Sequence, residues 1–198
     1  MVGHRIMGNL AIEAMTLDEF IQWQSKQDVR HEYLDGEIVA MTGGSVAHDD
    51  VRNNVMAKLR EHLRGSPCRA FGSDVALRPN SNTAWLYPDL FVTCRLESIG
   101  SVYVTSAKLI LEVLSPRTQG RDRVEKLQQY QQIDELSEYV LVDPHLHRIE
   151  IYRREANGTW KGPKVSKPEM PVIFESLEFV TTYDVIFEHV AKDPDETN

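Results

Sequence analysis

The feature that most constrains this chain is a run from Lys108 to Leu114 that is almost continuously apolar. Such a run is typical of a central strand buried on both faces of a sheet. One residue interrupts it. Glu112 places a carboxylate where burial without a partner would be costly. The run therefore predicts a sheet whose core contains a carboxylate that is paired with another group or serves a function.

Other elements are predicted on both sides of this strand. Thr16 and Glu19 fit a capping box at a helix start, and Asp35-Gly36 between two short runs is a strong hairpin signal. The predicted elements are a helix at 16–25, a hairpin at 30–41, a helix at 46–64 capped by Ser45, strands at 69–77 and 86–93, a helix at 121–132, strands at 138–142 and 148–153, an irregular stretch at 160–171 and a closing helix at 182–190. This order predicts an α/β or α+β fold, with a central sheet flanked by helices.

Composition limits the classes of function. The 198 residues include 30 acidic and 22 basic ones, for a formal net charge of −8. This balance argues against a protein that coats DNA through bulk positive charge, because phosphate contacts need a basic surface. It leaves open an enzyme whose acids hold a divalent metal at a phosphate.

The chain is expected to be one cytoplasmic domain at 16–190, with an extension at 1–15 and a disordered acidic tail at 191–198. No apolar stretch approaches 18 residues, so we expect no membrane span, and the polar start does not resemble a signal peptide. Cys68 and Cys94 have no paired spacing. We therefore expect reduced thiols rather than a disulfide or a zinc site.

Two acids and one helix face are the candidates for chemistry. Asp89 opens the strand at 86–93, and Glu112 lies within the apolar run. On neighbouring strands they would repel each other unless a cation lay between them, and Mg²⁺ prefers such oxygen ligands. Alternatively, each acid pairs with a nearby Arg or Lys. Asp122, Lys126 and Tyr130 share a helix face that could point to Glu112, or could carry an ordinary solvated ion pair.

In their order along the chain, these residues resemble a known family. The matching segments are Tyr33-Leu34-Asp35-Gly36-Glu37-Ile38, His48 after a Gly-rich loop, Tyr87-Pro88-Asp89-Leu90, Leu111-Glu112-Val113-Leu114-Ser115-Pro116, the Asp122–Lys126–Tyr130 face and Tyr139-Val140-Leu141-Val142-Asp143-Pro144. Together they resemble the Uma-type restriction endonuclease family of the PD-(D/E)XK nuclease superfamily, over roughly residues 16–190. The resemblance implies a restriction-endonuclease-like fold with a mixed central sheet.

The resemblance also implies roles for particular residues. Asp89 and Glu112 would bind the metal, with the backbone carbonyl of Val113 as a third ligand. Leu114 occupies the position at which the superfamily motif has a lysine, so Lys126 on the following helix is expected to take the catalytic role of that lysine.

Further residues are assigned to the site less directly. Glu37 would be a third carboxylate near the metal, and His48 and Tyr130 would lie near the same cleft. The arginines Arg117, Arg121 and Arg123 would contact the DNA backbone, or would belong to a solvated charged loop.

The function implied by the resemblance is a Mg²⁺-dependent DNA endonuclease, with Mn²⁺ as a substitute ion, acting as a homodimer. The first alternative is a catalytically decayed DNA-binding or dimerisation module of the same fold. The second is a zinc hydrolase, which would require His48, His145 and His147 to converge.

Overall fold

The computed structural model describes residues 15–80, 82–95 and 100–191. The expected extension and acidic tail therefore lie outside the described residues, apart from residues 15 and 191. Among the described residues, no helix is both long enough and apolar enough to cross a membrane.

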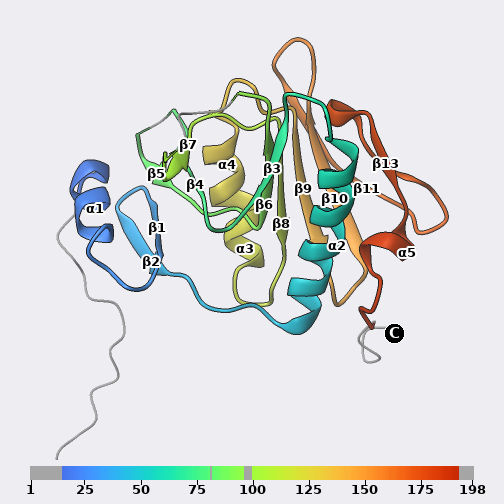
Figure 1. The fold of residues 1–198 in the computed structure, drawn as a ribbon, viewed down its shortest axis with the longest axis horizontal. Coiled ribbons are helices and arrows are strands. Elements are labelled where there is room, and N and C mark those ends of the chain that lie inside the picture. The colour runs from blue at the N-terminus through green and yellow to red at the C-terminus, as the bar shows by residue number, and fades with distance from the viewer. Residues whose placement is uncertain (1–14, 81, 96–99, 192–198) are drawn as a thin grey trace, which may run out of the picture.

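A six-stranded mixed sheet forms the centre of the molecule (Figure 1). Its strands, in spatial order, are β11 (Trp160–Val165), β10 (Arg148–Arg154), β9 (Glu138–Asp143), β8 (Leu109–Val113), β6 (Leu90–Thr93) and β3 (Arg69–Gly72). Only β8 and β9 pair in parallel within this sheet, and its other neighbours are antiparallel. All five residues of β8 are buried, which confirms the central strand predicted from the apolar run.

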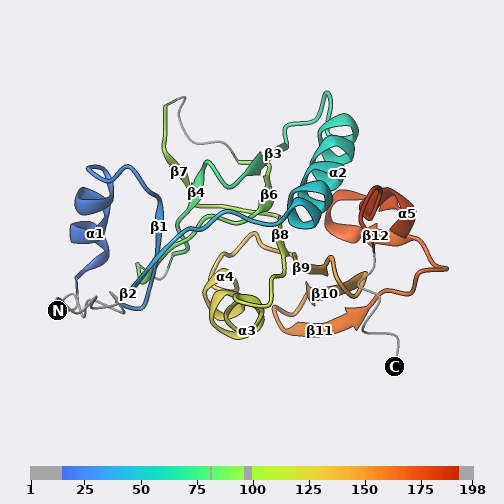
Figure 2. The ribbon, with the colours of Figure 1, turned by 90° about the horizontal axis from the view of Figure 1, so that it is seen from below.

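Helices cover both faces of this sheet (Figure 2). One face packs against α2 (Val46–His62), α5 (Tyr183–Ile186) and the hairpin of β12 (Val172–Phe174) and β13 (Phe179–Thr181), between which lies a 3₁₀ turn at Glu175–Leu177. The other face packs against a helix in three segments, which are α3 (Gln119–Arg121), a π-helical turn (Asp122–Lys126) and α4 (Leu127–Tyr130). The predicted mixed sheet flanked by helices is confirmed.

A smaller sheet lies beside the central one and carries α1 (Leu17–Gln24). It consists of β2 (Glu37–Ala40), β1 (His31–Leu34) and β5 (Ala84–Trp85), and a short parallel pair joins β4 (Ala76–Leu77) to β7 (Tyr103–Val104). The capping box of α1 and the hairpin turn are confirmed. Asp35 and Gly36 have φ values of 48° and 95°, the left-handed region that a tight primed turn needs.

Several predicted boundaries are wrong. The stretch predicted as irregular contains β11, an exposed edge strand in which Pro163 is tolerated because an edge strand has a side without ladder hydrogen bonds. The closing helix has only four residues, and the chain at His189 turns to a φ of 66°, which a right-handed helix cannot contain. The segment predicted as one strand at 69–77 is divided between β3 of the central sheet and β4 of the short parallel pair, and only residues 90–93 of the segment at 86–93 form a strand, β6.

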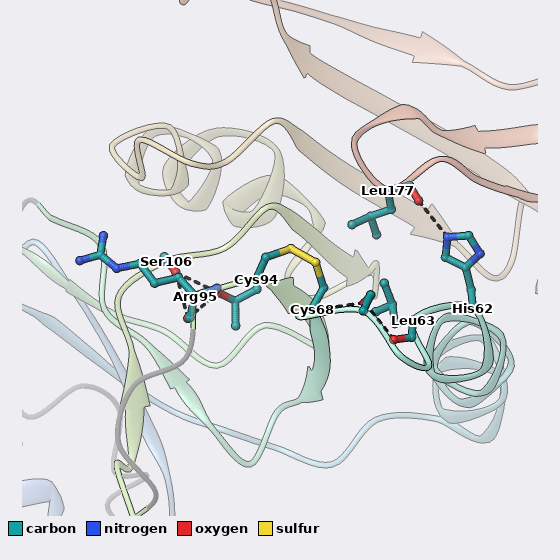
Figure 3. Close-up of a disulfide and its surroundings, with 9 residues drawn as sticks. His62, Leu63, Cys68, Cys94, Arg95, Ser106 and Leu177 are labelled. Atoms are coloured by element: carbon teal, nitrogen blue, oxygen red, sulfur yellow. Dashed lines mark hydrogen bonds between the residues drawn. A yellow bond between two sulfur atoms is a disulfide. The ribbon is translucent and has the colours of Figure 1, made fainter.

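The expectation of reduced thiols is also wrong, because Cys68 and Cys94 form a disulfide (Figure 3). Arg69 pairs with Thr93 in the antiparallel ladder of β3 and β6, so the two cysteines occupy the next facing positions. Their Cα atoms are 3.8 Å apart. A separation of 26 residues along the chain gives no hint of this juxtaposition, which depends on strand register.

We expect the disulfide to stabilise the fold against unfolding. Closing a loop of this length removes roughly 3–4 kcal/mol of chain entropy from the unfolded state. Urea titration followed by circular dichroism should therefore give a free energy of unfolding lower by about that amount under reducing conditions. The double variant Cys68→Ser/Cys94→Ser is the control, and its stability should not respond to the reductant. Equal wild-type stability with and without reductant would contradict the expectation.

Candidate active site

Asp89 and Glu112 meet at the edge where β6 and β8 pair. Leu90 and Leu111 are partners in this antiparallel ladder, so Asp89, just before β6, lies opposite Glu112. Side chains two residues apart share a face of a strand, so Asp89 and Glu112 both lie on the face that packs against α3 and α4, with Phe91 and Ile110. The predicted carboxylates therefore share one face of the sheet.

Backbone amides hold both carboxylates in place. The Val113 N–H donates to Asp89 Oδ2 at 2.8 Å, and the Asp89 N–H donates to Glu112 Oε2 at 3.2 Å. Each acid is thus fixed by the backbone of the other strand, so the ladder itself determines their relative position.

Lys126 enters this cluster from the helix on the same face. Its Nζ lies 3.1 Å from Glu112 Oε1, 3.1 Å from Glu32 Oε1 and 3.4 Å from Asp122 Oδ1. Only 7% of the residue is exposed. Tyr130 adds a second donor, because its hydroxyl group lies 2.8 Å from Glu112 Oε1.

A π-helical turn in this helix carries two of the buried polar groups. Asp122 and Lys126 are the first and last residues of the turn, and both are buried. The Tyr139 hydroxyl from β9 donates to the Asp122 carbonyl oxygen at 2.9 Å. Single π turns inside α-helices recur at functional sites.

Electrostatics keep Lys126 charged. Burial alone would lower the pKa of Lys126, but the carboxylates of Glu112, Glu32, Asp122 and Asp89 outweigh burial and raise that pKa well above its ordinary value. The ammonium group therefore stays protonated throughout the neutral range and cannot act as a general base. It serves as a fixed positive charge and hydrogen-bond donor.

The two principal acids have opposite pKa shifts. Burial raises the pKa of Glu112 well above its usual range, and the neighbouring acids add to this effect against the attraction of Lys126. Burial also acts to raise the pKa of Asp89. The pKa of Asp89 is nevertheless lowered, because three groups outweigh burial. These are His48 through its hydrogen bond and charge, the Val113 amide, and the charge of Lys126. Acids with separated pKa values in one cleft are typical of functional sites.

His48 contacts Asp89 from the start of α2. Its Nε2 lies 2.9 Å from Asp89 Oδ1, and its backbone N–H donates to the N-cap hydroxyl of Ser45. A Cβ atom at Gly44 would lie 3.0 Å from His48 Cγ and Cδ2. The glycine therefore leaves room for the imidazole ring beside Asp89.

Glu37 does not reach this cluster. It is exposed at the start of β2 and does not line the cleft, so the sequence prediction of its position is wrong. Glu32 of β1 lies there instead, with Oε1 accepting from the Tyr87 N–H at 3.2 Å. Strand parity could have indicated Glu32, because it shares a face with the buried Leu34.

Arg117, Arg121 and Arg123 are placed in three different environments. Arg123 is bound to the buried Glu150, with Nη2 3.1 Å from Oε1, so it is engaged in a structural ion pair. Arg117 is exposed on the loop after β8, and Arg121 is largely buried in the cleft wall.

The histidines do not converge. His48 and His145 line the cleft, whereas the His147 ring is stacked on Phe187 at a centroid distance of 4.2 Å. In the described part of the chain, no group of three or more His, Cys, Asp or Glu side chains is arranged to hold a metal ion. The geometry gives no support to the zinc alternative.

A cleft of about 900 Å³ opens onto Asp89, Glu112 and Lys126. One side is formed by the β1–β2 hairpin, the Gly43-Gly44 loop and the start of α2, and the other by the end of β8 and residues 115–122. The carboxylates of Asp89 and Glu112 and the Val113 carbonyl are hard oxygen donors. Such a set suits Mg²⁺, which is usually bound through one or two carboxylates and retains several waters.

A mixed sheet with helices on both faces and acids on adjacent strands defines the restriction-endonuclease-like class of fold. Residues 17–183 match the family described as "Uma2: Putative restriction endonuclease", and the chain belongs to this family.

Relatives and a solved structure agree with this assignment. The chain is 33% identical over 144 residues to uncharacterized protein slr1290 of Synechocystis, which covers 72% of this chain and 76% of the relative. It is 28% identical over 149 residues to sll1609 of the same organism, covering 74% and 84%. The crystal structure of a "putative nuclease belonging to DUF820" from Anabaena variabilis matches the fold with a TM-score of 0.74 at 17% identity, covering 89% of this chain and 99% of that one.

We expect Lys126→Met to destabilise the protein in a pH-dependent way in EDTA. Without the ammonium group, three buried carboxylates lose their counter-charge, at a cost of about 3–5 kcal/mol near pH 8. The pKa values of Glu112 and Asp122, which burial already raises, then rise further, so the folded state binds more protons than the unfolded state and stability falls as pH increases. The deficit should therefore shrink toward pH 5.

Urea unfolding at several pH values measures this effect. Lys58→Met is the control, because Lys58 is half exposed and its Glu61 partner lies 3.8 Å away. A deficit in Lys126→Met that is the same at pH 5 and pH 8 would contradict the proposed charge pairing.

Proposed function

We propose that this protein is a metal-dependent endonuclease that hydrolyses phosphodiester bonds in DNA, with Mg²⁺ as its cofactor and Mn²⁺ as a substitute. The observation that carries the proposal is the convergence of Asp89, Glu112 and Lys126 in one cleft, with the ammonium group 3.1 Å from Glu112. Family membership supports the same class of reaction.

In this proposal, Asp89, Glu112 and the Val113 carbonyl hold the metal. The bound ion would supply Lewis-acid stabilisation of the phosphate and a water of lowered pKa. The protein's own groups position these two carboxylates. The Val113 amide and His48 hold Asp89, while Lys126 and Tyr130 hold Glu112.

Lys126 supports catalysis over the decayed-module alternative. Leu114, at the usual lysine position, is buried in the apolar core between the sheet and the α3–α4 helix. A positive charge nevertheless reaches Glu112 from that helix. In our proposal, this ammonium group offsets negative charge on the phosphate and orients the attacking water.

On the resemblance alone, we propose that the protein is a homodimer, in which two sites would cut two strands. A cytoplasmic location is a separate proposal, and a reducing cytoplasm would convert the Cys68–Cys94 disulfide to free thiols. Light scattering of the full chain measures the oligomeric state.

Asp89→Asn and Glu112→Gln should each reduce Mg²⁺-dependent cleavage of supercoiled plasmid to background, because each removes a charged ligand. Glu37→Gln is the matched control. It neutralises an exposed acid outside the cleft and should cleave at the wild-type rate. Gel electrophoresis of the plasmid products, with Mn²⁺ in parallel reactions, provides the measurement.

Calorimetric titration with Mg²⁺, Mn²⁺ and Zn²⁺ separates the proposal from its alternatives. Binding of Mg²⁺ and Mn²⁺ that is lost in Asp89→Asn supports the nuclease. Wild-type protein that binds none of the ions would favour the decayed module, and a preference for Zn²⁺ that depends on His48 would favour the zinc hydrolase.

A further inference from the structure

Arg121 carries a largely buried guanidinium group with unpaired donors in the cleft wall. Its Nε and Nη2 atoms are buried and have no hydrogen-bond partner, and its side chain is 16% exposed. The exposed Glu125 contributes a carboxylate oxygen 3.6 Å from Nε, beyond hydrogen-bond distance. Leaving buried donors of a charged group unpaired is costly, so this arrangement calls for an explanation.

Arg117 also lines the cleft and is exposed to solvent on the loop after β8, whereas the other cations there have acceptors. Arg30 donates to the Ser73 carbonyl and to Asp74, Arg52 donates to Asp49, and Lys126 has its carboxylates. Arg123, two residues from Arg121, is bound to Glu150. Rotating any of these side chains toward a ligand would break bonds that they already make. Arg121 would break no hydrogen bond at Nε or Nη2, and would give up only the 3.6 Å ion pair with the exposed Glu125.

The position of Arg121 relates it to the proposed catalytic groups. It precedes Asp122, whose Oδ1 lies 3.4 Å from Lys126 Nζ, and it lines the same cleft as Asp89 and Glu112. A guanidinium group presents a planar pair of donors that matches two phosphate oxygens. The acids of the cluster would repel such an anion, so a separate cation in the wall is needed to hold it.

We infer that Arg121 binds a backbone phosphate next to the scissile phosphodiester, so that the substrate is an oligonucleotide strand rather than a mononucleotide. This inference rests on the proposed function. Arg121 is then a positioning residue, which swings from its unpaired place in the wall onto the phosphate when the strand enters the cleft.

The salt dependence of DNA binding tests this role. Fluorescence anisotropy of a labelled 20-base-pair duplex, with Ca²⁺ in place of Mg²⁺, gives the dissociation constant at several NaCl concentrations. Losing one phosphate contact should reduce the slope of log K against log salt by about 0.9. Arg121→Gln should show that change and bind about tenfold more weakly. Arg121→Lys should keep the wild-type slope, because it keeps the charge.

Arg60→Gln is the matched control, because Arg60 is exposed on α2 and does not line the cleft. Its affinity and slope should equal those of the wild type. If Arg121→Gln matches the wild type in both quantities, the inference is overturned and the proposed function stands. If the wild type does not bind the duplex at any salt concentration, the proposed function fails and the inference fails with it.

Discussion

A single buried ammonium group connects the parts of this protein that form its cleft. Lys126 contacts Glu112 in the central sheet, Glu32 in the neighbouring sheet and Asp122 in its own helical turn. Taking these charges out of water is expensive, and mutual attraction repays the cost only when the geometry is good and other hydrogen bonds complete the set. The Tyr87 amide at Glu32 and the Tyr130 hydroxyl at Glu112 help to complete it. The placement of the β1–β2 hairpin against the central sheet therefore depends on this polar contact as well as on the apolar packing of Leu34.

The π-helical turn lies at this same polar cluster. Here, the turn from Asp122 to Lys126 delivers an acid and its counter-charge to one buried point, and Tyr139 binds the Asp122 carbonyl. The residues that follow this turn pack against the sheet, where Tyr130 and Ile133 are fully buried. The helix thus changes from a polar to an apolar contact within about two turns.

Local signals in the sequence predicted what depends on local physics. The capping box, the Asp35-Gly36 turn and the apolar run around Glu112 each act within a few residues, and each is confirmed. The Cys68–Cys94 disulfide was missed because it depends on which strand lies beside which, and at what register. Strand parity could have placed Glu32 on a buried face, but its contact with Lys126 depends on the same arrangement of strands. Glu37 was misplaced for the same reason. It matched a family segment, but the hairpin turns it outward to solvent.

The charge balance of the cluster bears on how a nucleic acid could approach it. Asp89, Glu112, Glu32 and Asp122 gather around the single ammonium group of Lys126. Burial raises the pKa values of Glu112 and Asp122, which lessens but does not remove the excess of carboxylates over the ammonium group, so the cluster does not attract a phosphate. In the function we propose, a divalent cation at Asp89 and Glu112 reverses the sign of the local charge, and Arg121, 3.6 Å from the exposed Glu125, adds positive charge. The acids would thus make the approach of the substrate depend on the bound metal. A protein of net negative charge would then bind a polyanion only at the cleft that holds a divalent cation.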